Sequence, residues 1–340
     1  MADPSIQTFC CHPAMNESDP SISIMMEFNS ISYNTVCLVS SSIGMLGALY
    51  QLLPRKKPTL SHRWSTISPL RGRQTIIWLA LADMLASTGV FFRSILRLKG
   101  EFILYVHSFT GSILGTVYCA IFAAWIEYFY CVTWLWTLCY AIDMWLGLRD
   151  RPAYTYFYHS LCWVLPSVLT FTGLGILYFP NADCHNLKAG ESAFMRILPN
   201  YLLTYLPMLV VMIVNPIIYI LSLNKVQDLV TLNFSQFTRK ERMIVDATKL
   251  KFGLIILAFY VCWLPNLVNS ILLWTQWPNL PKPALITLWY IMAVVNPLQA
   301  FFNSLVYRRS NEKIVYFQRA TRQDPASEVT PLIASKIERL

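Results

Sequence analysis

The chain has 340 residues, of which 55% are hydrophobic, 14% aromatic and only 13% charged, whereas soluble globular proteins carry roughly 25% charged residues. This composition excludes disordered, collagen-like and small disulfide-stapled chains, and it favours lipid as the solvent. The net charge of +9 would suggest nucleic acid as a partner of a soluble protein. In a membrane protein it reports orientation instead, so we expect no nucleic-acid partner.

Seven long segments are almost without charged residues. A helix of about 20 residues crosses the roughly 30 Å hydrocarbon core of a bilayer, and each segment reaches that length. We therefore predict an all-α bundle of seven transmembrane helices over 31–307, between a segment 1–30 and a tail 308–340. The expected spans are about 31–53, 74–96, 117–141, 157–179, 199–223, 252–274 and 284–307.

Basic residues are distributed unevenly between the connections. The first 30 residues contain no Lys or Arg, and 21 of the 27 bases lie in 54–73, 142–156, 224–251 and 308–340. Because cytosolic connections accumulate Lys and Arg, this bias predicts a lumenal or extracellular N-terminus and a cytosolic C-terminus. The N-terminal segment has no basic stretch followed by an apolar core, so we expect the first span to act as an uncleaved signal anchor.

Two features of the predicted lumenal side concern covalent modification. Asn16 begins an Asn-Glu-Ser sequon and is a candidate N-glycosylation site. Cys119 opens the third span, and Cys184 lies in the loop after the fourth. In an oxidising compartment we expect a disulfide between them that ties this loop over the bundle mouth; the alternative is two unpaired thiols.

Four short strings lie in the spans where rhodopsin-type receptors carry similar ones. They are Leu81-Ala82-Asp83, Asp143-Met144-Trp145, Cys262-Trp263-Leu264-Pro265 and Asn296-Pro297. The Asp143 string lacks the usual arginine, and no tyrosine follows Asn296-Pro297 at the usual spacing. The first cytosolic loop is also long and contains prolines, so the chain departs from the typical pattern.

The whole pattern resembles the ocular albinism type 1 receptor family, which are atypical seven-helix receptors of pigment-cell organelles. The resemblance extends from about residue 8 to 310 and rests on strings in order along the chain: Thr8–Cys11, Gln51–Pro54, Cys139–Asp143, Tyr205–Pro207, Asn215-Pro216, Glu241–Met243, Cys262–Leu264 with Asn266, and Asn296-Pro297 with Gln299. It implies a rhodopsin-like bundle that senses a tyrosine-, dopa- or dopamine-like ligand. It also implies activation of heterotrimeric G proteins to regulate melanosome biogenesis and transport, with arrestin as a further candidate partner.

Three charged residues interrupt the spans, and charges inside a membrane are costly enough to be candidate functional sites. Asp83 is a candidate for sodium binding or for a hydrogen bond across the bundle, or it is a satisfied packing residue. Arg93 and Glu127 lie at similar depths in the second and third spans. They either neutralise each other or receive the carboxylate and ammonium groups of an amino-acid-like ligand. The aromatic residues expected around such a ligand are Trp125, Trp263 and Trp289.

The predicted cytosolic face offers charged residues to a G protein. The candidates are Asp143, Arg149, Arg151, Arg239, Lys240 and Arg242. The alternative is that these bases only set the topology and contact lipid headgroups.

The tail contains an acidic residue followed, after three residues, by two aliphatic ones. In an extended cytosolic peptide, Glu328 would face a basic patch of a clathrin adaptor complex, and Leu332 and Ile333 would enter its pocket. Together with the family resemblance, this predicts the membrane of a melanosome, lysosome or late endosome, with transient passage through the plasma membrane. Residues 308–319 mix basic and apolar side chains and are expected to form an interfacial amphipathic helix.

Other function classes have less support. No lysine lies within 283–307, so a retinal-binding opsin is excluded, and no cofactor is expected. The five histidines are scattered and no HExxH or GxSxG string occurs, so we expect no enzyme. A transporter or channel of the same organelle is the alternative function, although the two halves show no repeat.

Overall fold

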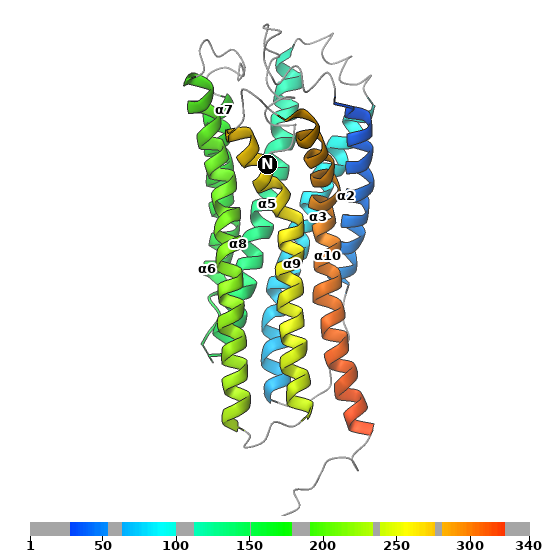
Figure 1. Cartoon of the computed structure of the whole chain (residues 1–340), viewed down its shortest axis with the longest axis vertical. Coiled ribbons are helices and arrows are strands. Elements are labelled where there is room, and N and C mark those ends of the chain that lie inside the picture. Colours follow the sequence, from blue (N-terminus) through cyan, green and yellow to red (C-terminus); the bar gives the residue numbers. More distant parts are fainter. Residues whose placement is uncertain are drawn as a thin grey trace, which may run out of the picture.

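The computed structural model describes residues 28–53, 63–99, 112–149, 151–178, 191–233, 239–275 and 281–323. The helices within these ranges are α2 (Ser30–Leu52), α3 (Arg63–Leu98), α5 (Ser112–Gly147), α6 (Thr155–His159), η2 (Ser160–Val164), α7 (Leu165–Tyr178), α8 (Glu191–Asn233), α9 (Arg239–Thr275) and α10 (Lys282–Gln323). Figure 1 shows them as an elongated bundle of roughly parallel rods.

Within the described ranges, seven helical segments are long and apolar enough to cross a membrane. They are Ser30–Leu52, Gly72–Leu98, Ala120–Gly147, Thr155–Ile176, Leu202–Gln227, Thr248–Leu272 and Lys282–Tyr307. The predicted all-α, seven-transmembrane architecture is confirmed. Several helices continue well past their apolar parts: α10 has 42 residues and includes 308–319, which are helical without a break from the seventh span.

The helices close into a ring in which neighbours along the chain are also neighbours in space. α2 packs on α3, α3 on α5, α7 on α8, α8 on α9 and α9 on α10, and α10 returns to α2. α5 also contacts α8, and its residues 130–141 are all buried. Because α5 is apolar around its whole circumference, it can occupy the centre of the bundle.

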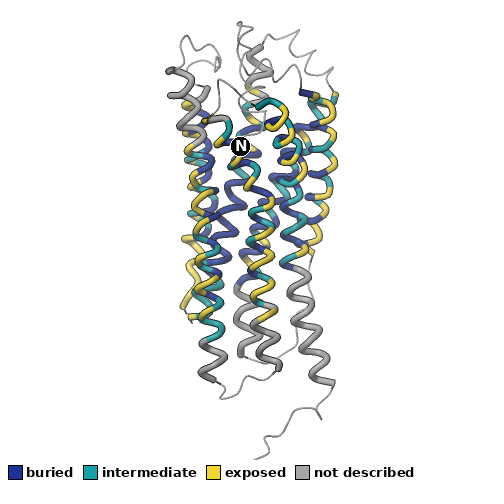
Figure 2. Tube along the Cα trace, viewed as in Figure 1, coloured by how far each residue is buried: buried dark blue, intermediate teal, exposed yellow. Residues whose placement is uncertain are grey.

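Polarity is arranged as expected for a protein dissolved in lipid. Exposed positions lie on the outward helix faces and buried positions face the interior (Figure 2). The outward faces carry large apolar side chains such as Phe171, Ile220 and Leu257, whereas the interior holds Asp83, Glu127 and a series of buried asparagines and serines. Hydrocarbon cannot satisfy polar groups, and several of these side chains bond across helices, as Asn303 does to Asp83 and Asn266 to Asn296.

Two glycines bring α2 against α10. A Cβ atom added to Gly44 would lie 2.2 Å from the carbonyl oxygen of Pro297, and one added to Gly47 would lie 2.5 Å from Cα of Phe301. Both distances are far below van der Waals contact, so only glycine permits this approach. Small residues at a transmembrane interface allow close backbone packing of this kind.

Prolines in two spans release backbone carbonyls that neighbouring helices then satisfy. Proline lacks an N–H, so the carbonyl four residues earlier loses its helical donor. The carbonyl of Met212, four before Pro216, accepts a hydrogen bond of 2.9 Å from Tyr260 Oη of α9. The carbonyl of Ala293, four before Pro297, accepts one of 2.7 Å from Ser40 Oγ of α2. Each proline therefore creates a bond between helices.

The fourth span is irregular near a third proline. The π-helical turn η2 (Ser160–Val164) separates α6 from α7, and Pro166 is the second residue of α7. A proline ring clashes with the carbonyl four residues before it, here that of Cys162. The wider π turn relieves this clash, which is a common cause of such bulges.

Candidate ligand site within the bundle

A group of aromatic side chains forms the centre of the bundle between α5 and α9. Trp263 of α9 is fully buried and packs edge-on against Tyr130 and Trp134 of α5, with ring centroids 5.0 and 4.7 Å apart. The indole N–H groups of both tryptophans and the hydroxyl of Tyr130 have no hydrogen-bond partner among the described residues. Trp263, which the sequence proposed for ligand contact, thus lies in the interior with unused donors around it.

Glu127 lies three residues before Tyr130 and so on the same face of α5. Its side chain is only 4% exposed. Thr204 Oγ1 of α8 donates a hydrogen bond to Oε1, while Oε2 is buried and has no hydrogen-bond partner within the described part of the chain. A carboxylate held in a low-dielectric interior with one oxygen unsatisfied is costly, and it therefore favours a cationic or hydrogen-bond-donating ligand.

Arg93 of α3 is also buried, at 7% exposure, and has interactions of its own with neighbouring groups. Arg93 and Glu127 are thus two buried charged residues on α3 and α5, helices that pack against each other. The hydrogen bond given to Glu127 comes from Thr204, a residue that the sequence did not single out because a lone threonine in an apolar span carries no pattern.

The other two proposed tryptophans lie elsewhere. Trp289 of α10 is buried, donates its indole N–H to Asn269 Oδ1 at 3.0 Å, and is covered by Phe28, whose ring centroid is 5.3 Å away. It closes the end of the bundle near the start of α2. Trp125 is 42% exposed and donates to the carbonyl of Leu85 at 2.9 Å. It lies on the outer seam between α3 and α5, because position 125 is turned away from the face that carries Glu127 and Tyr130.

Asp83 joins α3 to α10. It is buried and its Oδ2 accepts a hydrogen bond of 2.8 Å from Asn303 Nδ2. The hydrogen bond across the bundle that was one role considered for Asp83 is present, and sodium binding stays a prediction. Asn303 was not recognised in the sequence, although Asn296, Gln299 and Asn303 follow the spacing of one helix face.

The opposite end of the bundle carries the residues proposed to meet a G protein. Arg149 and Arg151 are exposed, and the Arg149 guanidinium lies over the Trp145 ring, 4.1 Å from its centroid. Asp143 is only 2% exposed and interacts inside the bundle, so in this conformation it offers no surface to a partner. Nearby, the Lys251 ammonium lies 5.5 Å from the centroid of the Tyr140 ring.

Several residues predicted from the sequence lie outside the described part of the structure. Asn16, Cys184, Glu328, Leu332 and Ile333 are among them, and the side chains of Cys119, Arg239, Lys240 and Arg242 are not described although their positions are helical. Within the spans, Cys139 and Cys162 are thiols whose sulfur atoms lie 3.5 Å apart. The disulfide, the glycan and the sorting signal therefore stay predictions.

Comparison with known proteins places this geometry in context. The sequence profile described as ocular albinism type 1 protein matches residues 1–323. The chain is 29% identical to G-protein coupled receptor 143 of Homo sapiens over 322 residues, which cover 90% of this chain and 77% of that protein. It is 22% identical over 280 residues to cyclic AMP receptor-like protein A of Dictyostelium discoideum, covering 81% of this chain and 64% of that protein, less than two thirds of its length.

Proposed function

Because the chain belongs to the ocular albinism type 1 protein family, we propose that this integral membrane receptor senses a tyrosine-, dopa- or dopamine-like ligand and activates heterotrimeric G proteins. The family is one of G protein-coupled receptors. The observation that carries the ligand proposal is the Glu127 carboxylate, which is buried and keeps one oxygen without a partner among the described residues.

Each ligand group has a counterpart of matching chemistry. The ligand ammonium donates a hydrogen bond to Glu127 Oε2, which otherwise has no donor among the described residues. A ligand carboxylate, where present, pairs with the Arg93 guanidinium. The aromatic ring packs against Trp263 and Tyr130, whose rings already meet edge-on. Ion pairs in a dry interior are strong when both charges are hydrogen-bonded, so the two charged ends fix the orientation of the ligand.

The signal passes from this site toward the other end through α9 and α10. Trp263 precedes Asn266 by one helical turn, and Asn266 is hydrogen-bonded to Asn296 of α10. The same face of α10 continues to Asn303 and thus to Asp83. Arg149, Arg151 and Arg242 contact the G protein at the far end, and arrestin would use the same surface.

The ligand-binding end faces the lumen in this proposal and the G protein binds in the cytosol, in agreement with the bias of basic residues toward one set of connections and the tail. A glycan at Asn16 and a Cys119–Cys184 disulfide belong to this lumenal side. Glu328, Leu332 and Ile333 recruit a clathrin adaptor that delivers the receptor to melanosome- or lysosome-type membranes, where it regulates organelle biogenesis and transport.

The ligand proposal is tested by nucleotide exchange on a purified heterotrimeric G protein, with the receptor in lipid nanodiscs and tyrosine, dopa or dopamine added. Glu127→Gln should weaken the response to all three ligands at least about 30-fold, because truncating one partner of a buried charge pair costs about 2 kcal/mol or more. Arg93→Gln should weaken the response to tyrosine and dopa and spare dopamine, which has no carboxylate. Arg97→Gln, one turn further along α3, is the matched control.

If Arg93→Gln weakened the response to all three ligands equally, the assignment of the ligand carboxylate to Arg93 would be refuted. If Glu127→Gln left the response unchanged, the proposed ligand site would be refuted. The sorting proposal is tested separately by changing Leu332 and Ile333 to Ala. This double variant should accumulate at the cell surface; if it stays in organelles, the sorting proposal fails and the receptor proposal stands. Recording of a ligand-driven transport current would favour the alternative of a transporter or channel.

A further inference from the structure

Lys251 of α9 lies near the end of the bundle that is proposed to meet the G protein. It is in the first turn of the span Thr248–Leu272, so its Cα is only about 5 Å along the helix from the end of that span. A lysine at this depth can extend its side chain out to the lipid headgroups. Instead, the Lys251 ammonium lies 5.5 Å from the centroid of the Tyr140 ring of α5. The lysine is thus turned toward an aromatic ring of another helix.

The Tyr140 ring is held in place by two further helices. Its ring packs edge-on against Tyr307 of α10, with centroids 5.1 Å apart. It also lies against Gly72 of α3, where an added Cβ would be 3.0 Å from Tyr140 Cε2. Tyr140 is buried, and a cation–π contact is stronger where water is excluded than at an exposed site. A ring fixed in this way also loses little conformational freedom when a cation binds to it.

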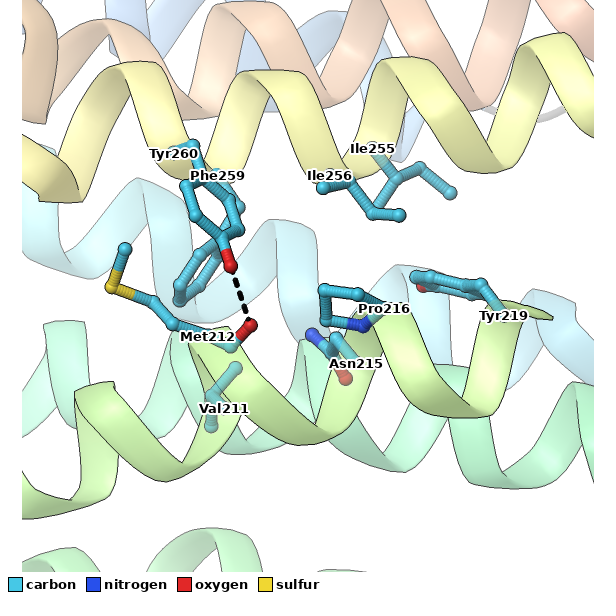
Figure 3. A pocket seen from close by; sticks show the side chains of 9 residues that line it. All are labelled: Val211, Met212, Asn215, Pro216, Tyr219, Ile255, Ile256, Phe259 and Tyr260. Carbon is cyan, nitrogen blue, oxygen red and sulfur yellow. Dashed lines mark hydrogen bonds between the residues drawn. The ribbon is translucent and has the colours of Figure 1, made fainter. Parts of the chain in front are cut away.

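α9 is held to its neighbours in different ways along its length. Within the described ranges its backbone packs closely on α8 and α10 but scarcely approaches α5. Near the middle of its span, Tyr260 donates to the Met212 carbonyl of α8, as Figure 3 shows. About two turns further toward the start of α9, the Phe252 ring stacks on Tyr219 of α8, with centroids 4.5 Å apart. The adjacent residue, Lys251, contacts α5. Two consecutive side chains therefore hold this end of α9 to two different helices.

The closed arrangement leaves two hydroxyl groups of this region unsatisfied. Tyr219 and Tyr307 are fully buried, and neither hydroxyl has a hydrogen-bond partner among the described residues. A buried hydroxyl without a partner is costly, and water that entered between the helices would remove this cost. The closed end is thus opposed by its own unsatisfied groups. It depends on contacts such as that between Lys251 and Tyr140 to stay closed.

We propose that Lys251 and Tyr140 form a latch that holds this end of α9 against α5 in the resting receptor. Release of the ammonium lets the start of α9 move away from α5 and α8, while the bond from Tyr260 to Met212 stays in place as the pivot. The proposal rests on the receptor function proposed above, because the opened end is where a G protein gains access. The latch contact is present only in the closed state, so removing it shifts the population toward the open state.

The first test measures the distance between the ends of α5 and α9 in the full-length receptor in lipid nanodiscs. Nitroxide labels on unnatural amino acids at positions 148 and 250 report this distance by pulsed electron paramagnetic resonance and leave the native cysteines unmodified. Lys251→Met removes the charge but keeps a long side chain, so the population with the longer distance should rise about two- to fivefold. Lys251→Arg keeps the cation and should resemble the unmodified receptor. Lys249→Met, at an exposed position of the same helix, is the matched control and should change nothing.

Variants of Tyr140 test whether its ring is the group that receives the ammonium. Tyr140→Phe keeps a ring and should keep the closed distance, whereas Tyr140→Leu should open the end as Lys251→Met does. The double variant of Lys251→Met with Tyr140→Leu should open no further than either single variant, since both remove the same contact. An unchanged distance in Lys251→Met, or equal opening by Tyr140→Phe and Tyr140→Leu, would overturn the proposal.

Nucleotide exchange on the purified G protein separates this proposal from the one on which it rests. Exchange without ligand should rise about two- to fivefold in Lys251→Met and stay unchanged in Lys249→Met. If the distance between α5 and α9 widens in Lys251→Met but exchange does not rise, the latch stands and the proposed coupling to a G protein fails. If exchange rises while the distance stays the same, Lys251 acts in another way and the latch is refuted.

Discussion

Asn266 of α9 and Asn296 of α10 exchange a pair of hydrogen bonds across the helix seam. Nδ2 of Asn266 donates to Oδ1 of Asn296 at 2.9 Å, and Nδ2 of Asn296 donates to Oδ1 of Asn266 at 3.2 Å. Asn266 directly follows Pro265, and Asn296 directly precedes Pro297. The paired amides thus join the two helices where each has lost a backbone hydrogen bond, at points where a change in helix direction costs little.

Alanine substitutions at the amide pair should show energetic coupling. Asn266→Ala and Asn296→Ala each leave a buried amide without its partner, so each should lower the unfolding free energy by about 1–2 kcal/mol. The double variant should lose less than the sum, with a coupling of about 0.6–1.7 kcal/mol, as for other hydrogen bonds between membrane helices. SDS titration in mixed micelles measures these free energies.

Asn34 provides the control for this cycle. It is buried, but its amide donates to the carbonyl of Ser30 within its own helix. The losses of unfolding free energy caused by Asn34→Ala and Asn296→Ala should therefore be additive, with no coupling between them. If the Asn266 and Asn296 substitutions were equally additive, the pair would contribute nothing beyond two separate polar residues.

The bond from Tyr260 to Met212 should depend on Pro216. Tyr260→Phe removes only the hydroxyl and should lower the unfolding free energy by about 1 kcal/mol. In a Pro216→Ala background, residue 216 regains the N–H that can satisfy the Met212 carbonyl, so the cost of Tyr260→Phe should fall toward zero. The same SDS titration, applied to the four proteins of the cycle, tests this.

Tyr128 offers a matched control for Tyr260. Its hydroxyl also donates to a carbonyl of another helix, that of Trp163 at 3.2 Å, but no proline lies four residues after Trp163. The cost of Tyr128→Phe should be the same in the unmodified receptor and in the Pro216→Ala background. A Tyr260→Phe cost that did not respond to Pro216→Ala would contradict the idea that the proline creates this bond.

Hydrophobicity was sufficient to predict the spans, because seven uncharged stretches of the required length leave few other arrangements in a bilayer. It also pointed to Arg93 and Glu127, since charges inside a span are conspicuous. It could not assign Trp125, because a tryptophan in an apolar helix is as suited to the lipid face as to the interior. Only the rotation of α5, set by packing on all sides, separates Trp125 from Tyr130.

Polar partners were harder to foresee. Thr204, Asn269 and Asn303 each bond a proposed site residue, yet each is a single small polar residue whose significance depends on which helix lies opposite. The bonds to the carbonyls of Met212 and Ala293 were hidden for a different reason. Each proline indicates that the backbone carbonyl four residues earlier lacks its helical donor. The side chain that donates to that carbonyl instead comes from a helix distant in sequence, so the sequence does not identify it.

Asp83 and Asn303 should tolerate changes that keep their hydrogen bond. Asp83→Asn retains an acceptor oxygen of the same shape and should change the unfolding free energy by less than about 0.5 kcal/mol, whereas Asp83→Leu leaves the Asn303 amide unpaired and should cost about 1–3 kcal/mol.

Because the Asp83 carboxylate already has a protein donor at 2.8 Å, the thermal stability of the receptor should be the same in sodium and in choline chloride. A midpoint that rises with sodium, and loses this rise in Asp83→Asn, would instead identify Asp83 as an ion ligand.

Gly44 should be intolerant of any side chain. An alanine methyl at this position would stand 2.2 Å from the Pro297 carbonyl oxygen, and that oxygen belongs to backbone, which cannot swing aside. Gly44→Ala should therefore push α2 from α10, weaken the bond from Ser40 to Ala293, and lower the unfolding free energy by about 1–3 kcal/mol, the usual cost of overpacking.

Gly175→Ala in α7 is the matched control, because nothing lies within 4 Å of its added Cβ. It should leave the unfolding free energy unchanged or raise it by up to about 1 kcal/mol through helix propensity. Thermal unfolding of the two purified variants beside the unmodified receptor distinguishes these outcomes, and equal behaviour of the two glycine substitutions would show that α2 and α10 are not in tight contact at this point.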